Sequence, residues 1–260
     1  MKTEDKPVGL FDSGVGGISV LREAVKLLPK EDFVYFGDSG NAPYGTKTVE
    51  EVRKLTFDAV DFLLSKNVKA VVVACNTATS AAIEDLRSEY ADMPIIGIEP
   101  ALKPAVEFSR RGKILIMATP MTLAEKKFSS LMKRYDEEAE IQPLPCPGLV
   151  ELIESGVTEG PLIEDYLRKK LDPFLEGGIA AVVLGCTHYP FIKGSLSKVM
   201  EANTPIIDGS QGTARQLKRE LTRCGILNKR NNRQKIEMCN SSEDPKLIRL
   251  SHRLLESNGE

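Results

Sequence analysis

Two short apolar runs that each end in a cysteine constrain the fold of this chain more than any other feature. Residues 71–74 lead into Cys75, and residues 181–185 lead into Cys186. Both runs are rich in valine, which is typical of buried parallel strands, and α/β proteins present their chemistry where such strands end. The sequence therefore predicts an α/β protein with a thiol at the carboxyl end of each of two buried strands.

The two runs belong to a longer internal repeat. Four pairs of landmarks recur in the same order at offsets between 107 and 111 positions: Asp12 and Thr119, Asp38 and Cys146, Cys75 and Cys186, and Pro94 and Pro205. A nearly constant offset indicates that one set of strand–loop–helix units occurs twice. We expect two pseudo-symmetric lobes, each with a mainly parallel sheet flanked by helices, and an active site in the cleft between them. The first lobe would contain residues 1–98 and 208–260, and the second residues 99–207.

Hydrophobic periodicity gives the expected elements of these lobes. Apolar runs predict strands at 7–11, 33–36, 71–73, 94–100, 114–117, 181–184, 205–207 and 235–239. Helical spacing predicts helices at 18–28, 49–64, 78–90, 214–224 and 245–255. Capping patterns are present at Thr48 with Glu51 and at Thr122 with Glu125, and the second predicts the start of a helix that contains Phe128.

Composition excludes several classes of function. The 260 residues are 42% apolar and 28% charged, and 35 basic residues nearly balance 37 acidic ones, so no basic stripe predicts a nucleic-acid partner. No segment has the ~20 consecutive apolar residues of a membrane span, and the N-terminus is polar, so we expect a cytoplasmic protein. Five cysteines in a reducing compartment predict free thiols. Cys146, Cys224 and Cys239 are expected in or near a core.

Paired thiols on opposite walls of a cleft have a specific chemical use. Inverting a carbon that bears hydrogen requires a base on one face and an acid on the other, and thiolate and thiol can fill these roles. Asp12 could hold or relay a proton near Cys75, and His188 could assist Cys186. The residue types that suit an amino group and two carboxylates are Ser13, Tyr44, Gly45, Asn76, Thr77, Thr119 and Thr187.

The glycine-rich segment 12–17 predicts a binding site for a small anion. Its glycines follow a predicted strand and precede a predicted helix, so backbone N–H groups can approach a small anion such as a carboxylate. No cofactor is expected. A zinc site built from Cys75, Cys186 and His188 lacks any recognised ligand spacing, and no lysine flanks the motifs to form a Schiff base with pyridoxal phosphate.

Four motifs carry a resemblance to a known family. They are GLFDSGVGG at 9–17, GD at 37–38 with PYG at 43–45, ACNTA at 74–78, and GCTHYP at 185–190. Together they resemble the glutamate racemases of bacterial cell-wall synthesis. The resemblance implies cofactor-independent interconversion of L- and D-glutamate, with the product supplied to peptidoglycan precursors.

The resemblance also implies roles for single residues. Cys75 would act on the face of the D-enantiomer and Cys186 on that of the L-enantiomer, and Glu154 stands where the family carries an assisting acid. The implied substrate pocket is lined by Asp12, Ser13, Pro43, Tyr44, Gly45, Asn76, Thr77, Thr187 and His188. The resemblance further implies a homodimer. It weakens after Asp208, and the short N-terminus lacks the extension with which some relatives bind a precursor activator, so regulation by that ligand is not expected.

Two alternatives stay open from the sequence. An aspartate or other amino-acid racemase of the same superfamily would use the same cysteine pair, because the size of the pocket sets the side chain that is accepted. A non-catalytic protein whose two lobes close on an amino acid would also fit the repeat, but it would leave both thiols without a role.

Overall fold

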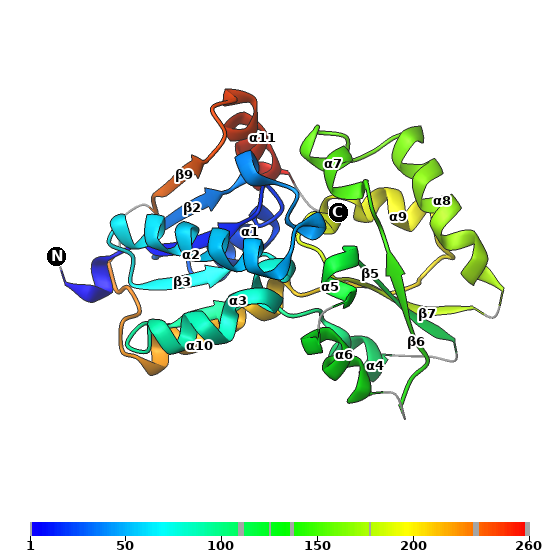
Figure 1. Cartoon of the computed structure of the whole chain (residues 1–260), viewed down its shortest axis with the longest axis horizontal. Helices are drawn as coiled ribbons and strands as arrows, with labels where there is room; N and C mark the ends of the chain where they lie inside the picture. The colour runs from blue at the N-terminus through cyan, green and yellow to red at the C-terminus, as the bar shows by residue number, and fades with distance from the viewer. Residues whose placement is uncertain are drawn as a thin grey trace.

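Two parallel β-sheets lie side by side and divide the molecule into two lobes (Figure 1). The computed structural model describes residues 2–108, 112–124, 126–135, 138–176, 178–230 and 234–257. The blue and cyan N-terminal segments and the orange and red C-terminal ones form one lobe, and the green and yellow middle of the chain forms the other. No helix in these ranges combines the length and apolar character needed to cross a bilayer.

The first sheet has five strands in the order β4-β3-β1-β2-β9, all parallel. The strands are β1 (Val8–Asp12), β2 (Phe33–Gly37), β3 (Ala70–Val73), β4 (Ile95–Gly97) and β9 (Ile236–Asn240). Helices α1 (Ile18–Leu27), α10 (Ser210–Arg223) and α11 (Pro245–Glu256) share one apolar core with the sheet. Helices α2 (Val49–Ser65) and α3 (Asn76–Glu89) form a second core, so both faces of the sheet are buried.

The second sheet has four parallel strands in the order β6-β5-β7-β8. The strands are β5 (Lys113–Ala118), β6 (Ile141–Pro145), β7 (Ile179–Leu184) and β8 (Ile206–Asp208). One face packs on α7 (Leu149–Glu154), α8 (Pro161–Leu175) and α9 (Lys193–Val199). The other face packs on α4 (Leu102–Phe108) and α6 (Lys126–Lys133), and the short α5 (Pro120–Ala124) precedes α6.

The repeat pairs occupy equivalent places in the two sheets. The order β4-β3-β1-β2 in the first sheet matches β8-β7-β5-β6 in the second. Asp12 and Thr119 lie at the ends of β1 and β5, and Cys75 and Cys186 follow β3 and β7. Because parallel strands end at one edge of a sheet, each lobe gathers these side chains at a single edge.

The structure differs from the predicted elements at several places, and β4 (Ile95–Gly97) is shorter than the predicted strand 94–100. Strand β6 was not predicted, because Pro143 and Pro145 interrupt its pattern; an edge strand tolerates proline. Helix α5 is capped by Thr119, whose Oγ1 accepts the N–H of Thr122 at 3.3 Å, so Thr122 is not the cap, and Glu125 lies outside the described residues. Helix α3 begins at Asn76 rather than residue 78.

The three remaining cysteines have different environments. Cys146 is buried, as predicted for a core thiol. Cys239 is partly buried on the edge strand β9, whereas Cys224 is exposed, although a place in or near a core was predicted for it. Cys224 is the C-cap residue that follows α10, beyond the buried face of the helix.

Candidate active site

A cavity of about 60 Å³ lies where the loop-bearing edges of the two sheets meet. Eleven of the thirteen predicted site residues line it: Ser13, Pro43, Tyr44, Gly45, Cys75, Asn76, Thr77, Thr119, Cys186, Thr187 and His188. Asp12 and Glu154 stand behind this lining, where each forms a hydrogen bond to one of its members. The structure thus brings the two cysteines to one cavity, each from its own lobe.

Cys75 occupies the N-cap position of α3, directly after β3. Its Sγ accepts the N–H of Ala78 and donates to Ser13 Oγ, both at 3.5 Å. Burial raises the pKa of this thiol to about 12, and the nearby charge of Asp12 adds to the rise. The two hydrogen bonds lower the pKa again only in part, so Cys75 is a protonated thiol at neutral pH when no substrate is bound.

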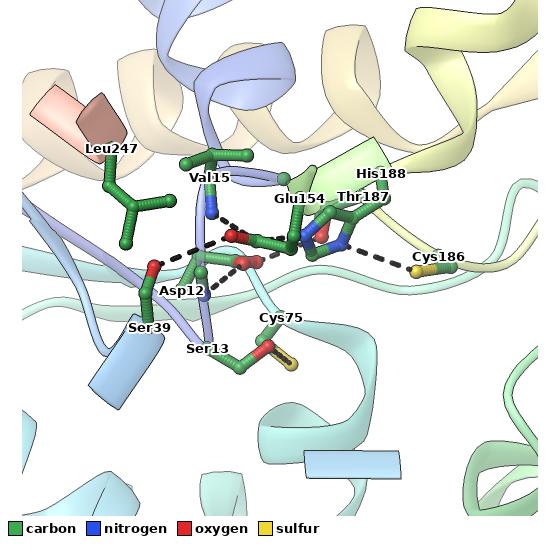
Figure 2. A network of polar contacts seen from close by, with 12 residues as sticks. Asp12, Ser13, Val15, Ser39, Cys75, Glu154, Cys186, Thr187, His188 and Leu247 are labelled. Atoms are coloured by element: carbon green, nitrogen blue, oxygen red, sulfur yellow. Dashed lines mark hydrogen bonds and ion pairs between the residues drawn. The ribbon is translucent and has the colours of Figure 1, made fainter. Parts of the chain in front are cut away.

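Cys186 follows β7 and has a cationic neighbour instead (Figure 2). Its Sγ lies 3.7 Å from Nδ1 of His188, whose Nε2 lies 2.6 Å from Oε1 of Glu154. Burial lowers the pKa of His188, but contacts with Cys186 and Glu154 outweigh it and hold this pKa well above the usual range. His188 therefore places a positive charge within 3.7 Å of the sulfur of Cys186.

Glu154 completes this row of groups from the end of α7. Burial raises the pKa of its carboxyl group, but the hydrogen bond and charge of His188 outweigh burial and lower it below the usual value. The backbone N–H of Val15 also donates to Oε1, at 2.7 Å. The glycine-rich segment, which was predicted to bind a small anion, here donates to the carboxylate of Glu154 from the other lobe.

Glycines in the same segment make this approach possible. A Cβ added to Gly14 would overlap Oε1 of Glu154, and one added to Gly16 would overlap Nδ1 of His188. Sequence reasoning attributed these glycines to ligand binding alone. Their contact with the second lobe could not be found without the fold, because Gly14 and Glu154 are 140 positions apart in the chain.

Asp12 joins the two lobes from the end of β1. It is fully buried and accepts the N–H of Gly14 at 3.0 Å and the hydroxyl of Thr187 at 2.8 Å. Burial raises the pKa of this carboxyl group, although the charge of His188 and the hydrogen bonds from Thr187 and Gly14 oppose the rise. Asp12 is therefore a buried carboxyl group that lies between the residues next to Cys75 and those next to Cys186. Both of its oxygens accept a hydrogen bond.

The loop after β2 supplies the wall that contains Tyr44 and Gly45. The hydroxyl of Tyr44 donates to Oδ2 of Asp38 at 2.7 Å, and burial together with this bond raises the pKa of the phenol. A Cβ on Gly45 would lie 2.7 Å from Cβ of Thr119. Glycine at position 45 thus lets the first lobe contact Thr119 of the second.

Two further groups are suited to bind a substrate. The side-chain oxygen Oδ1 of Asn76 is buried and has no hydrogen-bond partner among the described residues. The hydroxyls of Thr77, Thr119 and Thr122 form a closed cluster with separations of 2.9–3.2 Å. A buried polar atom without a partner is costly, so the oxygen of Asn76 is available to a donor such as an ammonium group.

Sequence reasoning missed part of the cavity wall. Cys146, Val150 and Glu151 line the cavity from the end of β6 and the start of α7. The repeat could have found Cys146, because it pairs with Asp38. Within the described ranges, no three His, Cys, Asp or Glu side chains form a group that could hold a metal ion.

Comparisons with known proteins cover nearly the whole chain. The model of the family described as Asp/Glu/Hydantoin racemase matches residues 13–217. A glutamate racemase from Clostridium kluyveri is 65% identical over 257 residues, which cover 98% of this chain and 100% of that protein. The solved glutamate racemase isoform from Bacillus anthracis has a TM-score of 0.87 at 31% identity and covers 98% of this chain and 96% of its own. The glutamate racemase from Francisella tularensis, solved in complex with D-glutamate, has a TM-score of 0.83 at 27% identity, with 98% and 95% covered.

Proposed function

Since the chain belongs to the Asp/Glu/Hydantoin racemase family, we propose that it interconverts L- and D-glutamate by proton transfer between Cys75 and Cys186. The observation that carries this proposal is the convergence of two strand-end thiols, from equivalent strands of two lobes, on one cavity. Each thiol can then face one side of a bound α-carbon, as inversion requires. The product D-glutamate supplies peptidoglycan synthesis.

The two thiols have different surroundings, because Cys75 contacts Ser13 whereas Cys186 contacts His188. In the direction from L- to D-glutamate, the thiolate of Cys186 removes the α-proton, so the C–H bond breaks and an S–H bond forms. The thiol of Cys75 then gives its proton to the opposite face of the carbanion, which leaves Cys75 as the thiolate. The unequal surroundings support this assignment, because His188 is cationic beside Cys186 whereas burial keeps Cys75 protonated.

Polar groups around the cavity hold the substrate for this transfer. The hydroxyls of Ser13, Thr77 and Thr187 and the amide of Asn76 bind the amino group and the two carboxylates. Backbone N–H groups at the start of α3 favour negative charge that develops in the transition state. Asp12 and Glu154 act through their partners Thr187 and His188. These groups supply the chemistry without a cofactor.

We further propose that the enzyme works in the cytoplasm and as a homodimer. Five free cysteines are consistent with a reducing compartment. The homodimer is what the family resemblance implies, and light scattering of the purified protein measures its mass directly.

The test of the function is a racemisation assay with purified protein and no added cofactor. Circular dichroism should follow the loss of optical activity of L-glutamate to zero, and L-aspartate should react far more slowly. In deuterated water, the α-deuterium should appear at first mainly in the product enantiomer, because the base that removes one proton is not the acid that returns the other. Equal early labelling of substrate and product would instead indicate a single exchanging base.

A further inference from the structure

The two carboxylate oxygens of Glu154 have different partners, and the proposed mechanism accounts for the partners of only one of them. Oε1 accepts from Val15 and contacts His188. Oε2 lies 3.5 Å from the hydroxyl oxygen of Ser39, in the short 3₁₀ helix η2 (Ser39–Asn41) that follows β2 (Figure 2). Ser39 thus contacts the far end of the row Cys186–His188–Glu154 from the first lobe.

The direction of the hydroxyl of Ser39 is fixed by Asn240. The N–H of Ser242 donates to Oδ1 of Asn240 at 2.8 Å, which identifies that atom as the amide oxygen. The amide nitrogen Nδ2 therefore faces Ser39 Oγ, at 3.0 Å. An amide nitrogen only donates, so Ser39 Oγ accepts from it, and the hydroxyl proton of Ser39 is left to point at Glu154.

The C-terminal strand β9 positions Asn240 beside Ser39. Asn240 is the last residue of β9 and lies in register with Gly37 of β2. A Cβ added to Gly37 would lie 3.0 Å from Nδ2 of Asn240, so glycine leaves room for this side chain. The next residue, Ser241, accepts the N–H of Gly40 at 2.9 Å and so ties η2 to the same strand. The segment in which the family resemblance weakens thus supports η2 directly.

We propose that Ser39 and Asn240 are positioning residues for the racemisation, because Asn240 orients the hydroxyl of Ser39 onto Glu154 and so holds the Glu154–His188 pair against Cys186. This inference depends on the proposed function. A hydroxyl that donates to Glu154 stabilises the ionised carboxylate, which in turn keeps the imidazolium of His188 directed at Cys186. Both residues act only on the Cys186 side, because Cys75 has separate partners in Ser13 and Ala78.

An effect on the Cys186 step alone can be detected by kinetic isotope effects. Two enantiomers have equal free energy, so kcat/KM must fall by the same factor in both directions when the Cys186 step is slowed. The kinetic isotope effects must diverge, however. With α-deuterated L-glutamate, from which Cys186 removes the deuteron, the isotope effect on kcat/KM should rise, and with α-deuterated D-glutamate it should fall towards 1.

The experiment compares Ser39→Ala and Asn240→Ala with the unmodified enzyme. We expect kcat/KM to fall roughly fivefold in each variant, which is the scale of losing one weak hydrogen bond to a charged group, with the two isotope effects diverging as described. Ser39→Thr keeps the hydroxyl and should restore both values. Ser13→Ala acts on Cys75 and should shift the two isotope effects in the opposite sense.

The control is Glu237→Gln on the same strand. It removes a solvent-exposed ion pair with Lys66 and should leave both isotope effects unchanged. Isotope effects in folded Ser39→Ala that equal those of the unmodified enzyme, or that move together, would overturn the proposal. A lack of racemisation by the unmodified enzyme would instead refute the proposed function, so the two failures are distinguishable.

Discussion

The hydroxyl of Thr187 donates to Oδ2 of Asp12 at 2.8 Å, and this buried hydrogen bond joins the edges of the two sheets. Thr187 directly follows Cys186, and Asp12 precedes Ser13, which contacts Cys75. One short bond therefore links the neighbourhoods of both thiols. Burial raises the pKa of the Asp12 carboxyl group and the same bond lowers it, so the bond also affects the charge in the site.

We expect Thr187→Val to lower the stability of the protein. Valine keeps the shape but removes the donor, so the buried carboxyl group of Asp12 retains only the N–H of Gly14. The free energy of unfolding should fall by about 2 kcal/mol, the usual cost of a buried polar group that loses its partner. Urea denaturation measures this change, and Thr187→Ser, which keeps the hydroxyl, should restore most of it. Equal stability of the valine and serine variants would contradict this role for the bond.

The pair of Glu154 and His188 predicts a defined pH dependence of stability. The pKa of Glu154 is below its ordinary value of 4.5 in the folded protein, so its contribution is present above pH 4.5 and is lost as the pH falls through the folded pKa. The pKa of His188 is above its ordinary value of 6.5, so its contribution is present below pH 6.5 and is lost as the pH rises through the folded pKa. Both contributions are complete between pH 4.5 and 6.5.

Glu154→Gln should therefore destabilise the protein most within that window. Removing one partner of a buried pair leaves His188 without its counter-charge, and we expect a deficit of about 3 kcal/mol near pH 5.5. The deficit should shrink towards more acidic and more alkaline pH in denaturant titrations. Glu50→Gln, at an exposed position in α2, is the matched control and should show no such profile. A deficit that is constant from pH 3.5 to 9 would show that the pair is not ionised.

Much of this architecture could be predicted from local pattern. The valine-rich runs before Cys75 and Cys186 are buried strands, because both faces of each sheet are covered and the pattern needs no alternation. The repeat placed these strands in equivalent positions, since its offset reflects a duplicated order of elements. Strand β6 was not predicted, because its two prolines are tolerated only in an edge strand. Which strand lies at the edge is known only once the sheet has assembled.

Contacts between the lobes could not be predicted. Nothing near Val15 in the sequence indicates that its N–H will meet Glu154, and nothing near Gly16 indicates the ring of His188. Such contacts depend on how two separately folded sheets face each other. Family resemblance named Glu154 as an assisting acid, but only the structure gives its partners, and the role of Asn240 had no local signal at all.

Gly16→Ala should reduce catalysis more than stability. The added methyl group would overlap both Nδ1 of His188 and Oγ1 of Thr187, so the ring that contacts Cys186 and its neighbour Thr187 cannot both keep their positions. Misplacing a catalytic neighbour by about 1 Å costs on the order of 100-fold in kcat/KM. Gly212→Ala is the matched control, because its Cβ meets no atom within 4 Å in α10, and alanine stabilises a helix by roughly 0.5–1 kcal/mol relative to glycine. Steady-state kinetics of both variants checks the prediction, and unchanged kinetics of Gly16→Ala would place His188 outside the reaction.

Replacing each catalytic thiol separately tests whether the two cysteines act on opposite faces of the substrate. Cys75→Ala and Cys186→Ala should each lower racemisation by at least ~10³, because one step of the transfer then lacks its acid or base.

Each variant keeps one thiol, so a slower partial reaction should survive. Cys75→Ala retains Cys186 and should exchange the α-proton of L-glutamate, but not of D-glutamate, with deuterated water, and Cys186→Ala should show the reverse. Proton NMR of the α-position follows both exchanges, with Cys224→Ala, which removes an exposed thiol, as the control for unaltered racemisation. Full activity in either of the first two variants, or exchange of both enantiomers by one of them, would contradict the two-base mechanism.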